Sequence, residues 1–160
     1  MPLPKLVEFL DRNNIAYITI AHSTAYTAQQ IAALTHISGR EVAKTVIVNL
    51  DGALAMAVLP ASQQIDLAAL AVATRTQSAR IAPETEFKGR FPDCETGAMP
   101  PFGNLYNMAV YVEEALTRDK DIAFNAGSHN QLVRLSYQDF ERLVKPMVAR
   151  FARQAGRTAA

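Results

Sequence analysis

The chain has 160 residues, of which 49% are hydrophobic, so it can bury a core without disulfides or a structural metal. Its 16 Lys and Arg residues nearly balance its 15 Asp and Glu residues, and a formal net charge of +1 gives no overall field that would attract a polyanion. The single cysteine, Cys94, excludes an intramolecular disulfide and a metal site built from several cysteines. Any contact with a nucleic acid would therefore depend on a few local cations.

The two ends of the chain predict a single domain with an irregular tail. The first residues show neither a signal peptide nor an apolar run long enough to span a bilayer, so we expect a soluble, cytoplasmic protein with no membrane contact. We assign one domain to residues 1–150 and a frayed Ala- and Arg-rich tail to residues 151–160. The sequence does not indicate an oligomeric state.

The first third of the chain alternates helix and strand signals. Apolar residues recur at helical spacing over residues 3–10, and β-branched residues over 15–20 predict a strand. Thr27 is a suitable N-cap for a helix that ends at 36–39. A further pair of strands, 42–50 and 53–59, flanks Asp51-Gly52, a dipeptide that suits the left-handed turn of a tight β-hairpin.

The rest of the chain predicts a mixed pattern that closes around one sheet. Three prolines and two glycines interrupt residues 91–103, which favours a fixed loop over a helix or strand. The fold class is therefore α+β, a single compact domain with a central, mostly antiparallel, barrel-like sheet flanked by helices. The other predicted elements are helices from Asp66 to Ala73, from Pro83 onward and from Ser136 to Leu143, and strands over 108–112, 122–126 and 133–135.

Lys44 is the most unusual residue of the predicted hairpin, because it interrupts an apolar strand. Alternation places it on the same face as Val42, Val46 and Val48. If that face is buried, the ammonium needs partners or a shifted pKa, and it could bind a phosphate or polarise a carbonyl. Alternatively, it is an edge-strand lysine that reaches solvent and discourages aggregation.

Two short glycine-containing segments are further candidates. The segment 97–103 combines a proline pair with two glycines, which could present backbone N–H groups to an oxyanion, or could form a structural turn that packs Phe102 into the core. His129 follows Gly127-Ser128 after a strand and lies either at a pocket mouth or on the surface. The three histidines lack metal-ligand spacing, so we predict no metal and no cofactor.

Taken together, these segments resemble the YbaK/ProX family of aminoacyl-tRNA deacylases, which are related to the editing insertion of bacterial prolyl-tRNA synthetases. The resemblance runs from about Leu3 to Pro146. It rests on Ala43-Lys44-Thr45, on residues 94–103, on Phe124-Asn125-Ala126-Gly127-Ser128-His129 and on Ser136-Tyr137-x-Asp139-Phe140.

The resemblance implies a trans-editing hydrolase that cleaves the ester between a small amino acid (Ala, Cys, Ser or Thr) and the acceptor end of mischarged tRNA. Prolyl-tRNA synthetase is an implied partner. Members specific for alanine tend to have Asn after the lysine, whereas this chain has Thr45, so the amino acid is left open. The implied catalytic residues are Lys44, Gly97 and His129, and the implied substrate-binding residues are Thr45, Ala98, Met99, Pro100, Pro101, Phe102, Gly103, Gly127 and Ser128.

The implied mechanism is mainly one of positioning, since no Asp or Glu stands out as a general base. The free ribose hydroxyl would help to activate water, Lys44 would bind the terminal phosphate or ester region, and the Gly97 amide would hold the carbonyl or oxyanion. His129 would orient the aminoacyl end. Two alternatives remain: a non-catalytic module that binds aminoacyl-tRNA or a nucleotide, and a hydrolase that uses Cys94 as nucleophile. Possible rim contributors are Arg40, Arg75, Arg80, Lys88 and Arg90.

Overall fold

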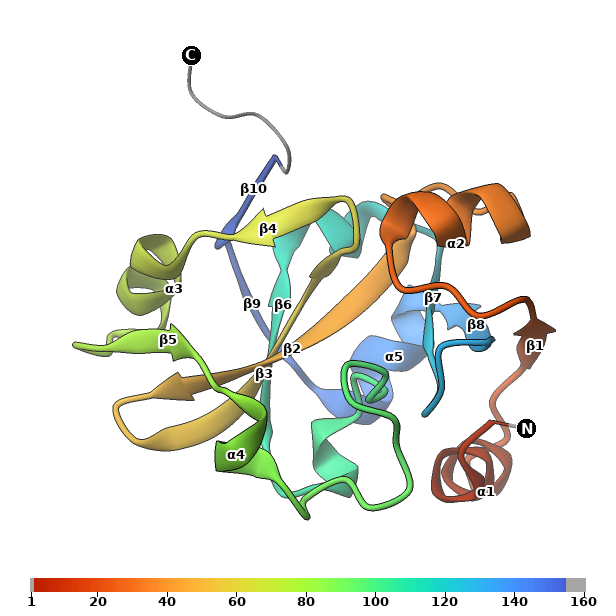
Figure 1. Ribbon diagram of the computed structural model, residues 1–160, viewed down its shortest axis with the longest axis horizontal. Coiled ribbons are helices and arrows are strands. Elements are labelled where there is room, and N and C mark those ends of the chain that lie inside the picture. The colour runs from red at the N-terminus through yellow and green to blue at the C-terminus, as the bar shows by residue number, and fades with distance from the viewer. Residues whose placement is uncertain (1, 155–160) are drawn as a thin grey trace.

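A computed structural model describes residues 2–154 and places a mixed eight-stranded sheet at the centre of the molecule (Figure 1). Its strand order is β1-β8-β7-β2-β3-β6-β9, and β5 pairs with the far end of β2. A separate two-stranded sheet pairs β4 (Gln63–Ile65) with β10 (Ala152–Gln154). The strands of the main sheet are β1 (Tyr17–Ala21), β2 (Val42–Leu50), β3 (Ala53–Pro60), β5 (Ala79–Ile81), β6 (Ala109–Glu113), β7 (Asp121–Asn125), β8 (Gln131–Ser136) and β9 (Met147–Ala149).

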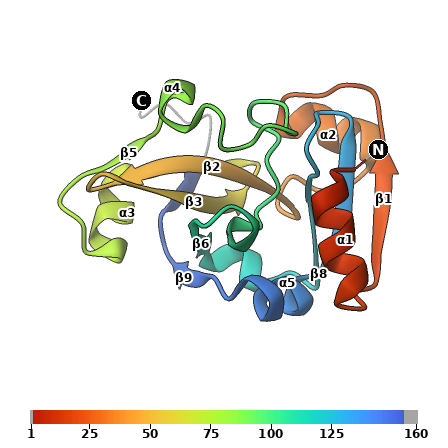
Figure 2. The same cartoon turned by 90° about the horizontal axis from the view of Figure 1, so that it is seen from below.

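Helices and loops cover both faces of this sheet, and β2 separates two hydrophobic layers. Ala43 and Ile47 point into the larger layer, together with side chains of α1, α5 and the segment 91–102. Val42 and Val48 point to the other side, where α2 and α3 pack. Figure 2 shows α1 beside β1 and β8, and α5 below β6. The helices are α1 (Pro4–Arg12), α2 (Ala28–Thr35), α3 (Leu67–Thr74), α4 (Glu84–Phe87) and α5 (Tyr137–Val144), with 3-10 turns η1 (Gly103–Leu105) and η2 (Glu114–Arg118).

The predicted hairpin is confirmed, together with its turn. Strands β2 and β3 pair from Leu50↔Ala53 to Ala43↔Pro60. Asp51 and Gly52 both have positive φ, +52° and +96°, as a tight turn between right-twisted strands requires. The hairpin therefore fixes which β2 side chains face each layer, Lys44 among them.

The predicted helix caps are also confirmed. The Thr27 hydroxyl accepts the Gln30 N–H (3.1 Å) within a full capping box. The Asp66 carboxylate and the Ser136 hydroxyl likewise accept the third N–H of α3 and α5. Local side-chain chemistry was therefore sufficient to place the starts of these helices.

The α+β architecture with one central, mostly antiparallel sheet is confirmed. Four of the seven strand pairs of the main sheet are antiparallel, and β2–β7, β3–β6 and β6–β9 run parallel, so the sheet is mixed. Within the described residues, the strand order is an open path from β1 to β9. No helix in this part of the chain is long and apolar enough to cross a membrane.

The predicted frayed tail is wrong for residues 151–154. Phe151 is fully buried, and β10 follows it directly. The carboxylate of buried Glu113 accepts N–H groups from Phe151 (2.7 Å) and Ala152 (2.9 Å). Phe151 is a lone apolar aromatic residue between Arg150 and Ala152, so the sequence shows no periodicity from which the strand could be predicted. The tail residues 155–160 lie outside the described part.

Candidate active site

The segment 95–98 and the turn 127–129 form one unit, which we call the clasp. The Glu95 N–H donates to the Gly127 carbonyl (2.8 Å), and the Gly127 N–H donates to the Ala98 carbonyl (2.9 Å). Gly97 and Gly127 have φ values of +85° and +102°, a region that side-chain-bearing residues rarely adopt. The two glycines thus allow two loops distant in sequence to pair through their backbones.

The His129 side chain fastens the clasp. Its Nε2 lies 2.9 Å from the Thr96 carbonyl oxygen, and since a carbonyl can only accept, Nε2 donates the hydrogen. The backbone N–H of His129 donates to the Glu95 carboxylate (3.1 Å). The imidazole Nδ1 is buried and has no partner within the described residues. The histidine therefore holds the segment 95–97 in place and keeps one unused acceptor.

Gly97 lies directly against this imidazole. A Cβ at Gly97 would lie 3.6 Å from Cε1 of His129. The Gly97 N–H donates to no group within the described residues. An exposed, unpaired N–H on a loop fixed by four hydrogen bonds is a suitable donor to a carbonyl or oxyanion that a ligand brings.

The residues after Gly97 lie inside the protein. Ala98 and Phe102 are fully buried, and Met99 is 4% exposed. The Phe102 ring contacts those of Phe9, Phe124 and Phe140. The buried residues are Ala98, Met99, Pro100, Pro101, Phe102 and Gly103, so these predicted substrate contacts support the loop from the core side.

The remaining predicted contacts are Gly127, Ser128 and Thr45, and each is buried or half-buried. Gly127 is buried, and the Ser128 hydroxyl donates to Asn130 (2.7 Å). Thr45 is 9% exposed, and its hydroxyl has no partner within the described residues. Alternation places Thr45 on the opposite face of β2 from Lys44.

Lys44 lines a separate hollow of about 360 Å³, which we call the lysine hollow. Burial lowers the pKa of the ammonium, which has no ion-pair partner within the described residues. Arg153, on β10, lines the same hollow. The other lining residues are Val46, Gln64, Ile65, Leu67 and Ile81, of which none is acidic.

The structure therefore brings Gly97 and His129 together, while the lining of the lysine hollow includes neither. The two regions are connected through neighbouring strands. β2 and β7 pair in parallel at Val42↔Ala123 and Ala43↔Phe124, and Lys44 is the next residue of β2. β7 ends at Asn125, two residues before Gly127, and the Asn125 amide oxygen is buried and has no partner within the described residues.

Two residues near the clasp were not predicted from the sequence. The Tyr26 ring lies against the His129 ring, with centroids 4.7 Å apart, and remains 71% exposed. Glu95 accepts the His129 N–H, as described above. Their positions depend on the backbone bond from Ala25 to the His129 carbonyl (3.0 Å) and on the pairing within the clasp, which no local pattern reveals.

Cys94 lines a second hollow, where its surroundings do not favour a thiolate. Burial is the main cause that raises its pKa, and its Sγ lies 3.7 Å from the Tyr106 hydroxyl. A nucleophilic cysteine needs the opposite shift. No cluster of three or more His, Cys, Asp or Glu side chains suited to a metal occurs between residues 2 and 154.

Comparison with known proteins assigns this arrangement to a family. A model of the aminoacyl-tRNA editing domain matches residues 22–143. The chain is 26% identical over 156 residues to the multifunctional Ser/Thr-tRNA deacylase ProXp-y of Escherichia coli, covering 94% of this chain and 93% of that protein.

Solved structures share the fold. The hypothetical protein APE2540 superposes with a TM-score of 0.82 at 20% identity, covering 93% of this chain and 99% of the other. A candidate trans-editing enzyme for prolyl tRNA synthetase superposes with a TM-score of 0.77 at 17% identity, covering 95% and 96%.

Proposed function

Because this chain belongs to the family of aminoacyl-tRNA editing domains, we propose that it hydrolyses the ester of tRNA mischarged with serine or threonine, acting in trans. Membership of this family makes the chain an aminoacyl-tRNA deacylase. The choice of serine and threonine is supported by the name of the Escherichia coli relative, which spans nearly the whole chain. tRNAs charged with alanine and with cysteine are included in the deacylation panel described below.

The observation that carries this proposal is the unpaired Gly97 N–H beside the fixed His129 ring. When water adds to the ester carbonyl carbon, negative charge develops on the carbonyl oxygen. A rigid N–H aimed at that oxygen stabilises the charge without having to reorganise. The ester bond to ribose then breaks, the ribose oxygen takes up a proton, and free amino acid and tRNA leave.

We assign a positioning role to His129. Its Nε2–H is committed to the Thr96 carbonyl, so this nitrogen is not available to remove a proton from water. The vicinal ribose hydroxyl of the substrate is the group proposed to assist the water. In this scheme the protein contributes a fixed donor, a place for the ester and a cation for the adjoining phosphate.

Lys44 supplies that cation. It lines a hollow free of carboxylates, so its charge is available for a ligand. Partial burial strengthens its attraction to a phosphate relative to a solvated lysine. The parallel pairing of β2, which carries Lys44, with β7, which leads into the Gly127 turn, supports binding of one acceptor end by both regions.

The test is a deacylation panel of tRNAs charged with Ser, Thr, Ala and Cys, with enzyme well below substrate. We expect repeated turnover with release of free amino acid, fastest for Ser- and Thr-tRNA. A non-catalytic binding module would instead release none and would protect the ester in proportion to the protein added.

A further inference from the structure

The lysine hollow contains a second unpaired cation. Arg153 lines it together with Lys44, and neither forms an ion pair within the described residues. Five of the other nine arginines among the described residues form ion pairs, as Arg80 does with Glu86 (2.6 Å) and Arg142 with Asp139 (3.1 Å). Two like charges that share a hollow without a carboxylate repel each other unless an anion lies between them.

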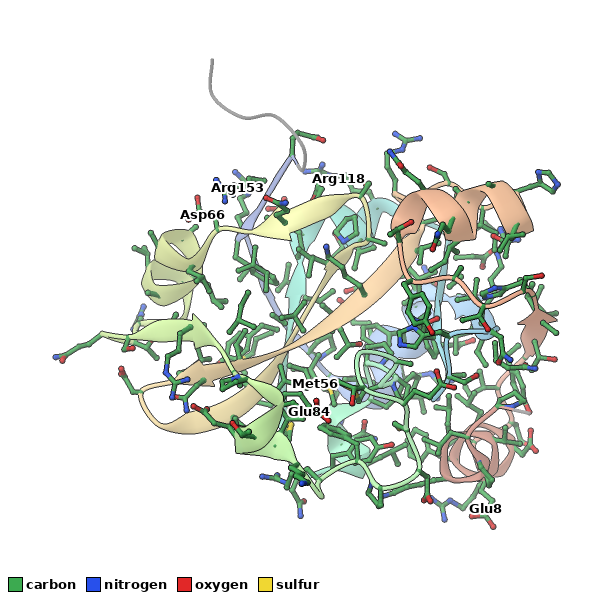
Figure 3. All side chains as sticks on the ribbon, viewed as in Figure 1. Glu8, Met56, Asp66, Glu84, Arg118 and Arg153 are labelled. Atoms are coloured by element: carbon green, nitrogen blue, oxygen red, sulfur yellow. The ribbon has the colours of Figure 1, made fainter. Side chains whose placement is uncertain are left out.

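The fold holds Arg153 at this position. β10 pairs with β4, and the register sets Arg153 opposite Gln64, so both side chains lie on the same face and line the hollow. The Glu113 carboxylate fixes the start of β10 by accepting two backbone N–H groups, as described above. Figure 3 shows Arg153 where β10 crosses β4, on the α3 side of the sheet.

The chemistry of these two side chains favours a phosphodiester. A guanidinium presents a planar set of N–H donors that matches two phosphate oxygens, and an ammonium adds a point charge. The hollow is otherwise lined by apolar side chains and one amide. Such a lining accommodates a ribose or base next to the phosphate better than it accommodates a second charged group.

We propose that Arg153 and Lys44 together bind a backbone phosphate of the single-stranded acceptor end of tRNA, so that the strand β10 forms part of the substrate site. This inference rests on the proposed function for the identity of the RNA. It assigns a binding role to a segment that follows residue 143, where the match to the family model ends.

The experiment measures binding of an uncharged acceptor-stem minihelix RNA ending in CCA, by fluorescence anisotropy at several salt concentrations. The variants are Arg153→Gln and Arg142→Gln. Both lose one arginine, but Arg142 lies on α5, whose Phe140 packs in the layer on the other face of the sheet. Arg153→Lys keeps the charge and removes the planar fork.

We expect Arg153→Gln to raise the dissociation constant about tenfold. The slope of the logarithm of the binding constant against the logarithm of the salt concentration should become shallower by about 0.7, the value for one phosphate contact on a single strand. Arg142→Gln should bind like the wild type, and Arg153→Lys should lie between the two. Equal binding by Arg153→Gln and wild type would overturn the proposal. An equal loss in both glutamine variants would also overturn it, because it would indicate a general charge effect.

Two further readouts keep the result interpretable. Arg153 is exposed, so thermal melting should show Arg153→Gln folded like the wild type. If the melting temperature of Arg153→Gln falls, the binding affinity of a folded Arg153→Lys variant becomes the deciding measurement. Affinity equal to that of the wild type would contradict a role for the planar guanidinium of Arg153. If the wild type binds the minihelix through Arg153 but releases no amino acid from any charged tRNA, the proposed function fails while this inference stands.

Discussion

The clasp and the lysine hollow differ in how their polar groups are used. In the clasp, backbone and side-chain hydrogen bonds tie Glu95, Thr96 and Ala98 to Gly127 and His129. In the lysine hollow, two cations have no ionic partner within the described residues. The polar groups of the clasp therefore fix its conformation, whereas the cations of the lysine hollow remain available to a ligand.

This difference separates two kinds of contribution to one reaction. A network of hydrogen bonds holds a donor such as the Gly97 N–H in a fixed place, which favours the transition state. An unsatisfied charge costs stability in the free protein and is compensated only when an anion binds. Substitutions in the two regions should therefore change different measured quantities.

The largest effect is expected from Lys44→Met, which removes the charge and keeps the length of the side chain. We expect kcat/KM for deacylation to fall roughly a thousandfold, at the upper end of what one preorganised polar group contributes. The melting temperature should be unchanged or higher, because burial disfavours the ammonium. Deacylation kinetics and thermal melts of the same preparation check both expectations, and a large loss of stability would contradict the account.

Gly97→Ala should slow the reaction about a hundredfold, mainly through kcat, because a Cβ strains the φ of +85° and displaces the N–H donor. Gly52→Ala is the matched control. Its φ of +96° imposes a similar strain at an open hairpin turn remote from the clasp. Similar kcat losses in both variants would show that strain alone, without a role for the Gly97 N–H, explains the effect.

His129→Ala should lower kcat roughly tenfold, less than the roughly hundredfold that a misplacement of about 1 Å can cost. His129→Gln should recover most of the rate, since its amide can still donate to the Thr96 carbonyl. A purely structural role would lower stability in step with activity. Failure of the glutamine variant to recover the rate would argue that the imidazole itself takes part in proton transfer.

The smallest effect is a pH dependence of binding. Because burial lowers the pKa of Lys44 below its ordinary value of 10.5, affinity for the uncharged minihelix should fall as the pH rises through the lowered value. The sign for stability is opposite: the folded state binds fewer protons than the unfolded state, so the free energy of unfolding rises with pH in that window. Lys44→Met should abolish the binding trend, and its persistence in that variant would contradict the assignment.

Much of the fold was predictable from local chemistry. The β2–β3 hairpin followed from Asp51-Gly52, and the helix starts followed from Thr27, Asp66 and Ser136. The short strands β4, β5, β9 and β10 were not predicted, because three-residue strands carry no periodicity and depend on long-range pairing. The parallel pairs of the sheet were missed for the same reason.

The site was predictable only in part. Sequence identified Lys44, Gly97 and His129, but it did not reveal that Lys44 lines a hollow whose lining includes neither Gly97 nor His129. It also named other basic residues as possible rim contributors and omitted Arg153. That arginine reaches the hollow only through the pairing of β10 with β4, a contact between residues almost ninety positions apart in sequence.

Deacylation by this chain, with Lys44 as the cation of the site, is tested by multiple-turnover hydrolysis of Ser-tRNA by wild type and Lys44→Met, at one enzyme molecule to many tRNA molecules. We expect the wild type to release many equivalents of serine, while the folded Lys44→Met variant releases serine roughly a thousandfold more slowly. Wild-type rates in the variant, or no turnover by the wild type on any tRNA of the panel, would contradict it.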